Sequence, residues 1–127
     1  LVYLLGKAAW SSGGIVSNAE TICKWGYELY SPKGNAISEN TRKLLYQSIL
    51  DINADKTDVY GYGIRKLFYK DFEFVGSYGR SIGSENLLFY NEQYDTSFCI
   101  LSNCNMMTNG SPNIDELLFW LFECIKF

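Results

Sequence analysis

The chain has 127 residues, enough for one hydrophobic core, and 47% of them are apolar, which excludes a disordered tail. The net charge of -3 disfavours a nucleic-acid partner. The chain contains no histidine, so it lacks both the imidazole base of most hydrolytic triads and the commonest metal ligand.

The first half of the chain shows two helix patterns. The first helix is expected to begin after Ser17 or Asn18 as N-cap and to end at Pro32. A second helix is expected to open at Ser38, with Thr41–Lys43 on its polar face. Its predicted buried side consists of Ile37, Leu44, Leu45, Ser48 and Ile49.

The second half is rich in aromatic and β-branched residues, which favours strands. Asp51–Asp58 is expected to be a surface connection, and Tyr60–Gly63 a strand entry that needs a positive φ. The predicted strands are Tyr62–Tyr69, Phe72–Tyr78, Asn86–Tyr90 and Thr96–Ser102, the last two joined by a hairpin.

A final helix is predicted after Pro112, and its apolar residues lie on nearly all sides, so we expect it to be buried on more than one side. Short connections favour an α+β fold in which helices flank an antiparallel β-sheet. The longest apolar stretch, Leu117–Phe122, is too short to span a membrane.

The cysteines are Cys23, Cys99, Cys104 and Cys124. No pair has CxxC spacing, so we expect four free thiols, with Cys23 and Cys124 as small buried hydrophobes in helices. No metal and no cofactor is expected. No secretory leader is recognised, and the compartment stays open.

A search for nucleophilic chemistry finds no Ser-x-x-Lys spacing in the chain. The nearest pattern, Thr21–Lys24, lies within an ordinary amphipathic helix. Ser12–Gly14 lacks the spacing of a phosphate-binding loop. The residues alone therefore predict an α+β domain without a self-contained active site.

Several segments resemble the serine β-lactamase-related family of class C-type β-lactamases, D-alanyl-D-alanine carboxypeptidases and related esterases. Ala8–Gly26 is similar to the family stretch A-W-S-x-G-G-h-x-S-T-A-x-D-L-x-K-W. Gly76–Asn91 is similar to G-H-G-G-S-I-P-G-F-S-S-L-L-F-Y-N, and Asp95–Asn103 to the strand that follows. Tyr60–Gly63 stands where the family has Y-G-Y-G.

The resemblance implies that residues 1–127 are a single partial domain, the C-terminal part of the β-lactamase/transpeptidase-like fold. The family's nucleophilic Ser-x-x-Lys and its Tyr-x-Asn pair would lie upstream of Leu1, which is not a methionine start. The intact parent would transfer or hydrolyse a small-molecule or peptide acyl substrate, a lactam, D-Ala peptide or ester. This chain is expected to be inactive alone. Members of the family are often periplasmic or secreted.

The resemblance also locates the family's third motif, Lys or His followed by x-Gly. A gapless alignment places Ser77 at the Lys/His position, Tyr78 in the middle and Gly79 at the glycine. The backbone N–H of Arg80 would then complete the oxyanion hole. Because Ser77 supplies neither a cation nor a titrating group, the motif is degraded. The other register, which starts at Tyr78, needs a deletion.

Two alternatives remain open at this point. A non-catalytic binding or interaction module could have kept a degenerate β-lactamase-like scaffold without its chemistry. Alternatively, a missing N-terminal portion could complete the domain in trans. In that case a strand edge left open would promote self-association of the lone chain.

Overall fold

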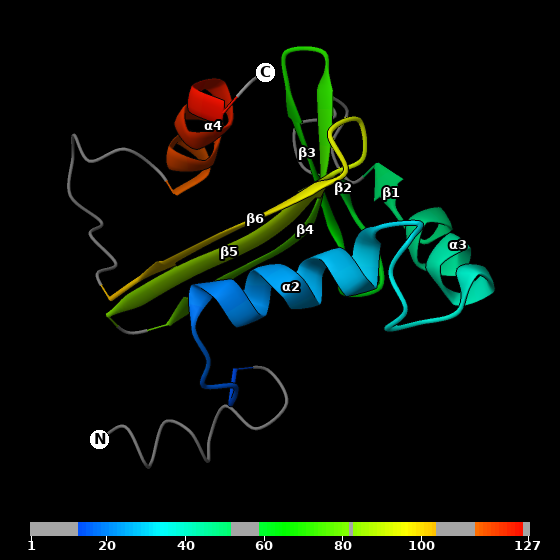
Figure 1. The fold of residues 1–127 in the computed structure, drawn as a ribbon, viewed down its shortest axis with the longest axis horizontal. Coiled ribbons are helices and arrows are strands. Elements are labelled where there is room, and N and C mark those ends of the chain that lie inside the picture. The colour runs from blue at the N-terminus through cyan, green and yellow to red at the C-terminus, as the bar shows by residue number, and fades with distance from the viewer. Residues whose placement is uncertain (1–12, 52–58, 82, 104–113, 126–127) are drawn as a thin grey trace.

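The computed structural model describes residues 13–51, 59–81, 83–103 and 114–125. The described helices are α2 (Ala19–Tyr30), α3 (Glu39–Gln47) and α4 (Ile114–Ile125). The described strands are β1 (Leu50–Asp51), β2 (Val59–Tyr60), β3 (Arg65–Tyr69), β4 (Phe72–Ser81), β5 (Ser84–Asn91) and β6 (Thr96–Ser102). They form one antiparallel sheet in sequence order, which confirms the α+β class (Figure 1).

The N-caps of α2 and α3 are the residues that the sequence indicates. The Asn18 side chain accepts a hydrogen bond from the Thr21 N–H at 2.9 Å, and the Ser38 hydroxyl accepts one from the Thr41 N–H at 3.1 Å. Each cap satisfies a backbone donor that has no partner within its helix. Helix α2 ends at Tyr30, close to the predicted stop at Pro32.

The predicted faces of α3 are wrong in two places. Leu44, expected to be buried, is 66% exposed, while Arg42, expected on the polar face, is 5% exposed. The Arg42 guanidinium donates hydrogen bonds to the carbonyl groups of Leu29 at 3.1 Å and Gly34 at 2.8 Å. A buried cation is tolerated here because backbone carbonyls replace its hydration.

Strands β4 and β5 form a long ladder, from Val75 opposite Tyr90 to Ser81 opposite Ser84. The strand predicted to end at Tyr78 therefore continues for three more residues. In the segment Tyr60–Gly63, which was predicted to need a positive φ, Gly63 has a φ of 72°. Strand β1, which begins at Leu50, was not predicted.

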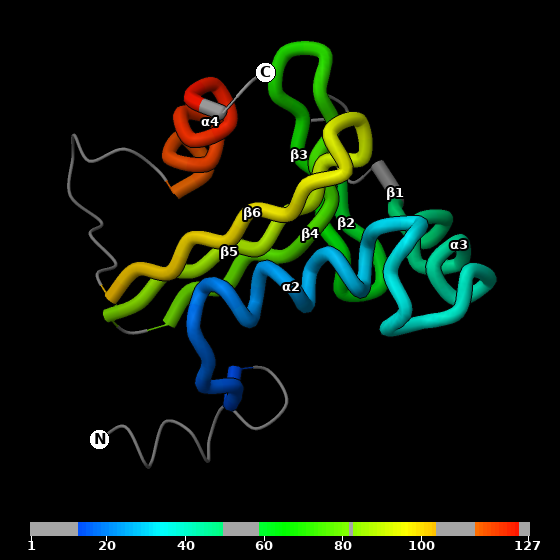
Figure 2. The backbone as a smooth tube through the Cα atoms, in the orientation of Figure 1, coloured from blue at the N-terminus to red at the C-terminus, as the bar shows by residue number. Residues whose placement is uncertain are grey.

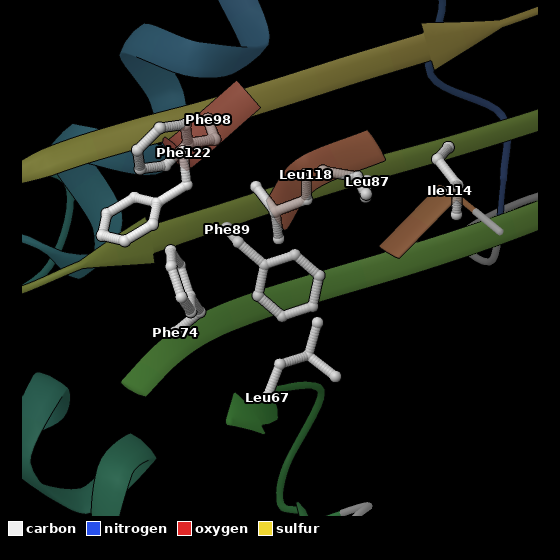
Figure 3. Close-up of a cluster of buried hydrophobic side chains, with 8 residues drawn as sticks. All are labelled: Leu67, Phe74, Leu87, Phe89, Phe98, Ile114, Leu118 and Phe122. Atoms are coloured by element: carbon white, nitrogen blue, oxygen red, sulfur yellow. The ribbon is translucent and has the colours of Figure 1, made fainter. Parts of the chain in front are cut away.

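The sheet lies between α2 on one face and α4 on the other (Figures 1 and 2). On the α2 face, Val75 and Tyr90 pack with Tyr30 and Ile64. On the α4 face lies a larger core, which consists of Leu67, Phe74, Leu87, Phe89, Phe98, Ile114, Leu118 and Phe122 (Figure 3). Because side chains alternate along a strand, β4 and β5 contribute to both cores.

Among the described residues, helix α4 is buried on one side only, contrary to the expectation of burial on more than one side. Its buried residues Ile114, Leu118 and Phe122 form one stripe at helical spacing, and the half-buried Phe119 beside them stacks on Tyr69 of β3. Trp120 is 58% exposed and Leu121 39% exposed, because they lie off this stripe. The predicted burial of Cys124 on the same helix is also wrong, since this residue is exposed.

One carboxylate joins the β5–β6 turn to α2. Asp95, whose φ is 47°, accepts hydrogen bonds from Lys33 at 2.6 Å, Tyr90 at 2.8 Å, Ser31 at 2.8 Å and Tyr27 at 3.2 Å. The bonds from Lys33 and then Tyr90 hold the pKa of the Asp95 carboxyl far below its usual range. Its ionised form therefore stabilises the packing of α2 against this turn.

We expect Asp95→Asn to lower the free energy of unfolding at pH 7 by about 2 kcal/mol, because four donors lose a charged acceptor. The carboxyl is more acidic in the folded chain, so its contribution is complete above the unfolded pKa of about 3.9 and is lost as the pH falls below it. Urea unfolding at pH 7 and pH 3 measures both effects. Glu20→Gln, in an exposed pair with Lys24, is the matched control. An equal loss at both pH values would contradict the prediction.

We expect Phe122→Ala to lower the free energy of unfolding by about 3–5 kcal/mol, since it leaves a cavity among Phe74, Phe98 and Tyr94. Trp120→Ala on the exposed side of the same helix should cost less than about 1 kcal/mol. Urea denaturation of both variants is the measurement. Similar losses would show that α4 is also buried on its outer side.

Candidate functional site

The predicted motif residues 77–80 lie near the C-terminal end of β4. Strand β3 pairs with β4 only as far as Arg65 opposite Gly76, whereas β5 pairs with it up to Ser81. Among the described strands, the segment Ser77–Ser81 therefore has a neighbour on the β5 side only. The candidate motif occupies the part of β4 that extends beyond β3.

The register also determines where the backbone groups of this segment point. Two residues separate Ser81 from Ser84, and the pair that closes such a tight hairpin is hydrogen-bonded. By alternation, Gly79 bonds to β5, and the N–H and C=O groups of Tyr78 and Arg80 are directed away from β5. The Arg80 N–H thus points toward the side of β4 that β3 does not cover.

The side chains of the motif do not form one cluster. Tyr78 packs against the core beneath α4, and Arg80 lies on the same face, since it is two residues further along the strand. Ser77 lies on the opposite face, with Val75, toward α2. The structure therefore brings Tyr78 and Arg80 together and separates Ser77 from both.

Tyr78 and Arg80 share a carboxylate partner on β5. The Glu85 Oε1 accepts a hydrogen bond from the Tyr78 hydroxyl at 3.1 Å and lies 2.5 Å from a guanidinium nitrogen of Arg80. The Arg80 Cζ is 5.6 Å from the centre of the Tyr78 ring, and the Arg65 Cζ is 5.8 Å from it. Burial, and then Glu85, raise the pKa of Tyr78. The phenol is thus a poor base at neutral pH.

Arg65 extends this cluster to α4, because its guanidinium lies 3.7 Å from an Asp115 carboxylate oxygen. Sequence reasoning missed Arg65, Glu85 and Asp115. The partnership with Glu85 had a signal in the sequence, because a hairpin closed by Ser81 opposite Ser84 places Arg80 directly opposite Glu85. The contact with Asp115 joins segments distant in sequence and carried no such signal.

Neither Cys23 nor Cys99 offers an activated thiolate nucleophile. Cys23, Cys99 and Cys124 are free, and Cys104 lies outside the described residues. The Cys23 thiol donates to the Ser97 carbonyl at 3.0 Å, and burial raises its pKa. Burial, and then Cys23, raise the pKa of Cys99 to about 11. Both are therefore protonated at neutral pH.

Two grooves border α3, and neither involves the motif. One of about 270 Å³ is lined by Tyr30, Pro32, Glu39, Arg42, Lys43, Tyr46 and Glu92. The other, of about 370 Å³, is lined by Leu29, Tyr30, Ile37, Thr41, Leu44, Leu45, Tyr62 and Gly63. Both share Tyr30 and lack any residue of β4.

The described residues were also searched for a metal site and for a membrane-spanning helix. The described residues contain no group of three or more Cys, Asp or Glu placed to hold a metal ion. Within the same part of the chain, no helix is both long and apolar enough to cross a membrane. The beginning of the resembling segment, Ala8–Ser12, lies outside the described residues.

Comparisons of the chain with protein-family models, with curated proteins and with solved structures gave no match. The resemblance to the serine β-lactamase-related family therefore stays a prediction that rests on its motifs.

We expect Glu85→Ala to lower the free energy of unfolding by about 1–2 kcal/mol, because Tyr78 and Arg80 lose a shared, largely buried acceptor. The matched control is Glu73→Ala on the neighbouring strand pair, whose exposed ion pair with Lys66 should contribute less than about 1 kcal/mol. Urea unfolding at low and high salt measures both. Equal losses for the two variants would contradict a specific role of Glu85.

Proposed function

We propose that this chain is the C-terminal part of a β-lactamase-related serine hydrolase, and that β4 supplies one wall of its active site. A single observation supports the proposal: the segment Ser77–Arg80, which the resemblance matches to the third motif, lies on the part of β4 that extends beyond β3. The Arg80 N–H is directed toward that side, as an oxyanion-hole donor requires.

Each part of the chain would have a defined role in such an enzyme. The Arg80 N–H would stabilise negative charge on the oxygen of a tetrahedral intermediate. Ser77 offers a hydroxyl in place of the cation of the family motif, so it would bind a substrate carboxylate only weakly. The nucleophile and its base would come from a Ser-x-x-Lys upstream of Leu1.

The geometry around Arg80 allows its amide N–H to act as a donor independently of its side chain. Its guanidinium forms an ion pair with Glu85 on the α4 face, while its amide is directed along the plane of the sheet. The side chain and the amide thus point in different directions. A change of the side chain need not affect a donor function of the amide.

A non-catalytic binding module remains a second proposal. Its supporting observation is that Ser77 lacks the charge of the family motif, while the Tyr78 hydroxyl is engaged by Glu85. The coding sequence upstream of Leu1 separates the two proposals. An in-frame Ser-x-x-Lys supports the hydrolase, and a stop codon or an unrelated domain supports the module.

We expect the 127-residue chain alone to show neither covalent labelling by a fluorescent penicillin nor turnover of a chromogenic ester, because it contains no Ser-x-x-Lys. Denaturing gels and absorbance measurements test this. Labelling or turnover by the chain alone would refute the proposal that the nucleophile lies outside this chain.

The longer chain allows a sharper test of the oxyanion-hole role. In a product that carries Ser-x-x-Lys, Arg80→Pro should slow acylation about 100-fold, because it removes the N–H directed away from β5. Arg80→Ala is the matched control, since it keeps the N–H and should retain most of the rate. Equal rates for the two variants would refute this role of the Arg80 amide.

A further inference from the structure

The Arg42 groove, the cavity of about 270 Å³ beside α3, combines charged and aromatic side chains. Four of its residues lie on one face of α3, because residues three and four apart are neighbours on a helix. They are Glu39, Arg42, Lys43 and Tyr46. Glu92 reaches the same groove from the turn between β5 and β6. The groove therefore joins segments that are distant in sequence.

Arg42 carries a buried charge that the described chain does not neutralise. Its side chain is 5% exposed, and its Nε donates to the Leu29 carbonyl at 3.1 Å. The Nη2 donates to the carbonyl groups of Gly34 at 2.8 Å and Ile37 at 3.5 Å. Among the described residues, Nη1 has no hydrogen-bond partner and no carboxylate forms an ion pair with Arg42. Because carbonyls carry no net charge, this guanidinium favours an anionic group from a ligand.

The two carboxylates of the groove differ in their partners. Glu39 forms an ion pair with Lys43, so its charge is already matched. Glu92 is exposed and forms no ion pair with any residue in the described part of the chain. Burial raises the pKa of the Tyr46 phenol, Glu92 raises it further and Arg42 lowers it, so both charges act on the same ring. The groove thus holds one cation and one anion without a counter-charge.

The remaining residues of the groove give it an apolar surface. Tyr30 is 3% exposed, and its carbonyl accepts a hydrogen bond from the Tyr46 hydroxyl at 3.0 Å. The polar end of Tyr46 is therefore engaged within the protein, and its ring lines the groove together with Pro32. The volume is slightly below the roughly 300–1,000 Å³ of pockets for drug-sized ligands, which favours a smaller molecule.

We propose that the Arg42 groove binds a zwitterionic α-amino acid with an apolar side chain. The Arg42 Nη1 binds the carboxylate, Glu92 binds the ammonium group, and the apolar side chain lies against Tyr30, Pro32 and Tyr46. A ligand with a single charge would leave either Arg42 or Glu92 unmatched. Because the groove contains no residue of β4, this inference does not rest on the proposed function.

Isothermal titration calorimetry of the 127-residue chain with three probes tests which charges are recognised. L-phenylalanine carries both charges, 3-phenylpropanoate lacks the ammonium group, and 2-phenylethylamine lacks the carboxylate. We expect L-phenylalanine to bind at least about tenfold more tightly than either analogue, because only it matches both Arg42 and Glu92. Equal affinities for the three probes, or no binding of L-phenylalanine at about 10 mM, would overturn the proposal.

Glu92→Gln tests the partner of the ammonium group without changing a buried residue. It should raise the dissociation constant of L-phenylalanine at least about tenfold. The same change should not weaken 3-phenylpropanoate, because the carboxylate that it removes can only repel this anion. The matched control is Glu20→Gln, which removes an equal charge from an exposed pair on α2 and should alter neither affinity. An equal loss for both ligands would contradict the assigned role of Glu92.

NMR chemical shifts of the backbone amides locate the bound amino acid independently of any variant. L-phenylalanine should move the signals of Arg42, Tyr46 and Glu92 in a saturable way, and those of Cys99 and Leu101 on β6 should stay in place. Saturable shifts confined to another part of the chain would refute the proposal, since a different surface would then bind the amino acid.

Discussion

The pairing of β4 with β5 is the constraint on which the rest of the structure depends. It runs from Val75 opposite Tyr90 to Ser81 opposite Ser84, and each of the two strands contributes side chains to both cores. A shift by one residue would exchange the faces of Phe74 and Val75 and leave both cores unfilled. The register is therefore fixed by burial on two sides as well as by the turn.

This register also positions the candidate site. It places Glu85 opposite Arg80, where one carboxylate meets both the guanidinium and the Tyr78 hydroxyl. It directs the Arg80 amide toward the side that β3 leaves uncovered. In the function proposed here, the Arg80 amide is the backbone donor, while the side chains of the candidate motif supply no nucleophile.

Several elements were predictable because their signals are local. The caps Asn18 and Ser38 and the hairpin between β5 and β6 depend on residues close in sequence. The faces of α3 and α4 were not predictable in the same way. Arg42 is buried because it reaches carbonyls of the α2–α3 segment, and Trp120 is exposed because α4 meets only one layer. The hydropathy pattern therefore predicts neither the burial of Arg42 nor the exposure of Trp120.

The sequence by itself determined the α+β class, the order of the helices and of strands β3 to β6, and the absence of Ser-x-x-Lys, because these follow from periodicity, capping and residue identity. Only the tertiary structure decided that helices cover both faces of the strand that carries Ser77 and Tyr78, and that Arg65 reaches Asp115. It also decided that β6 ends the described sheet. These facts depend on how distant segments pack, and burial of both faces of the β4–β5 pair sets that packing.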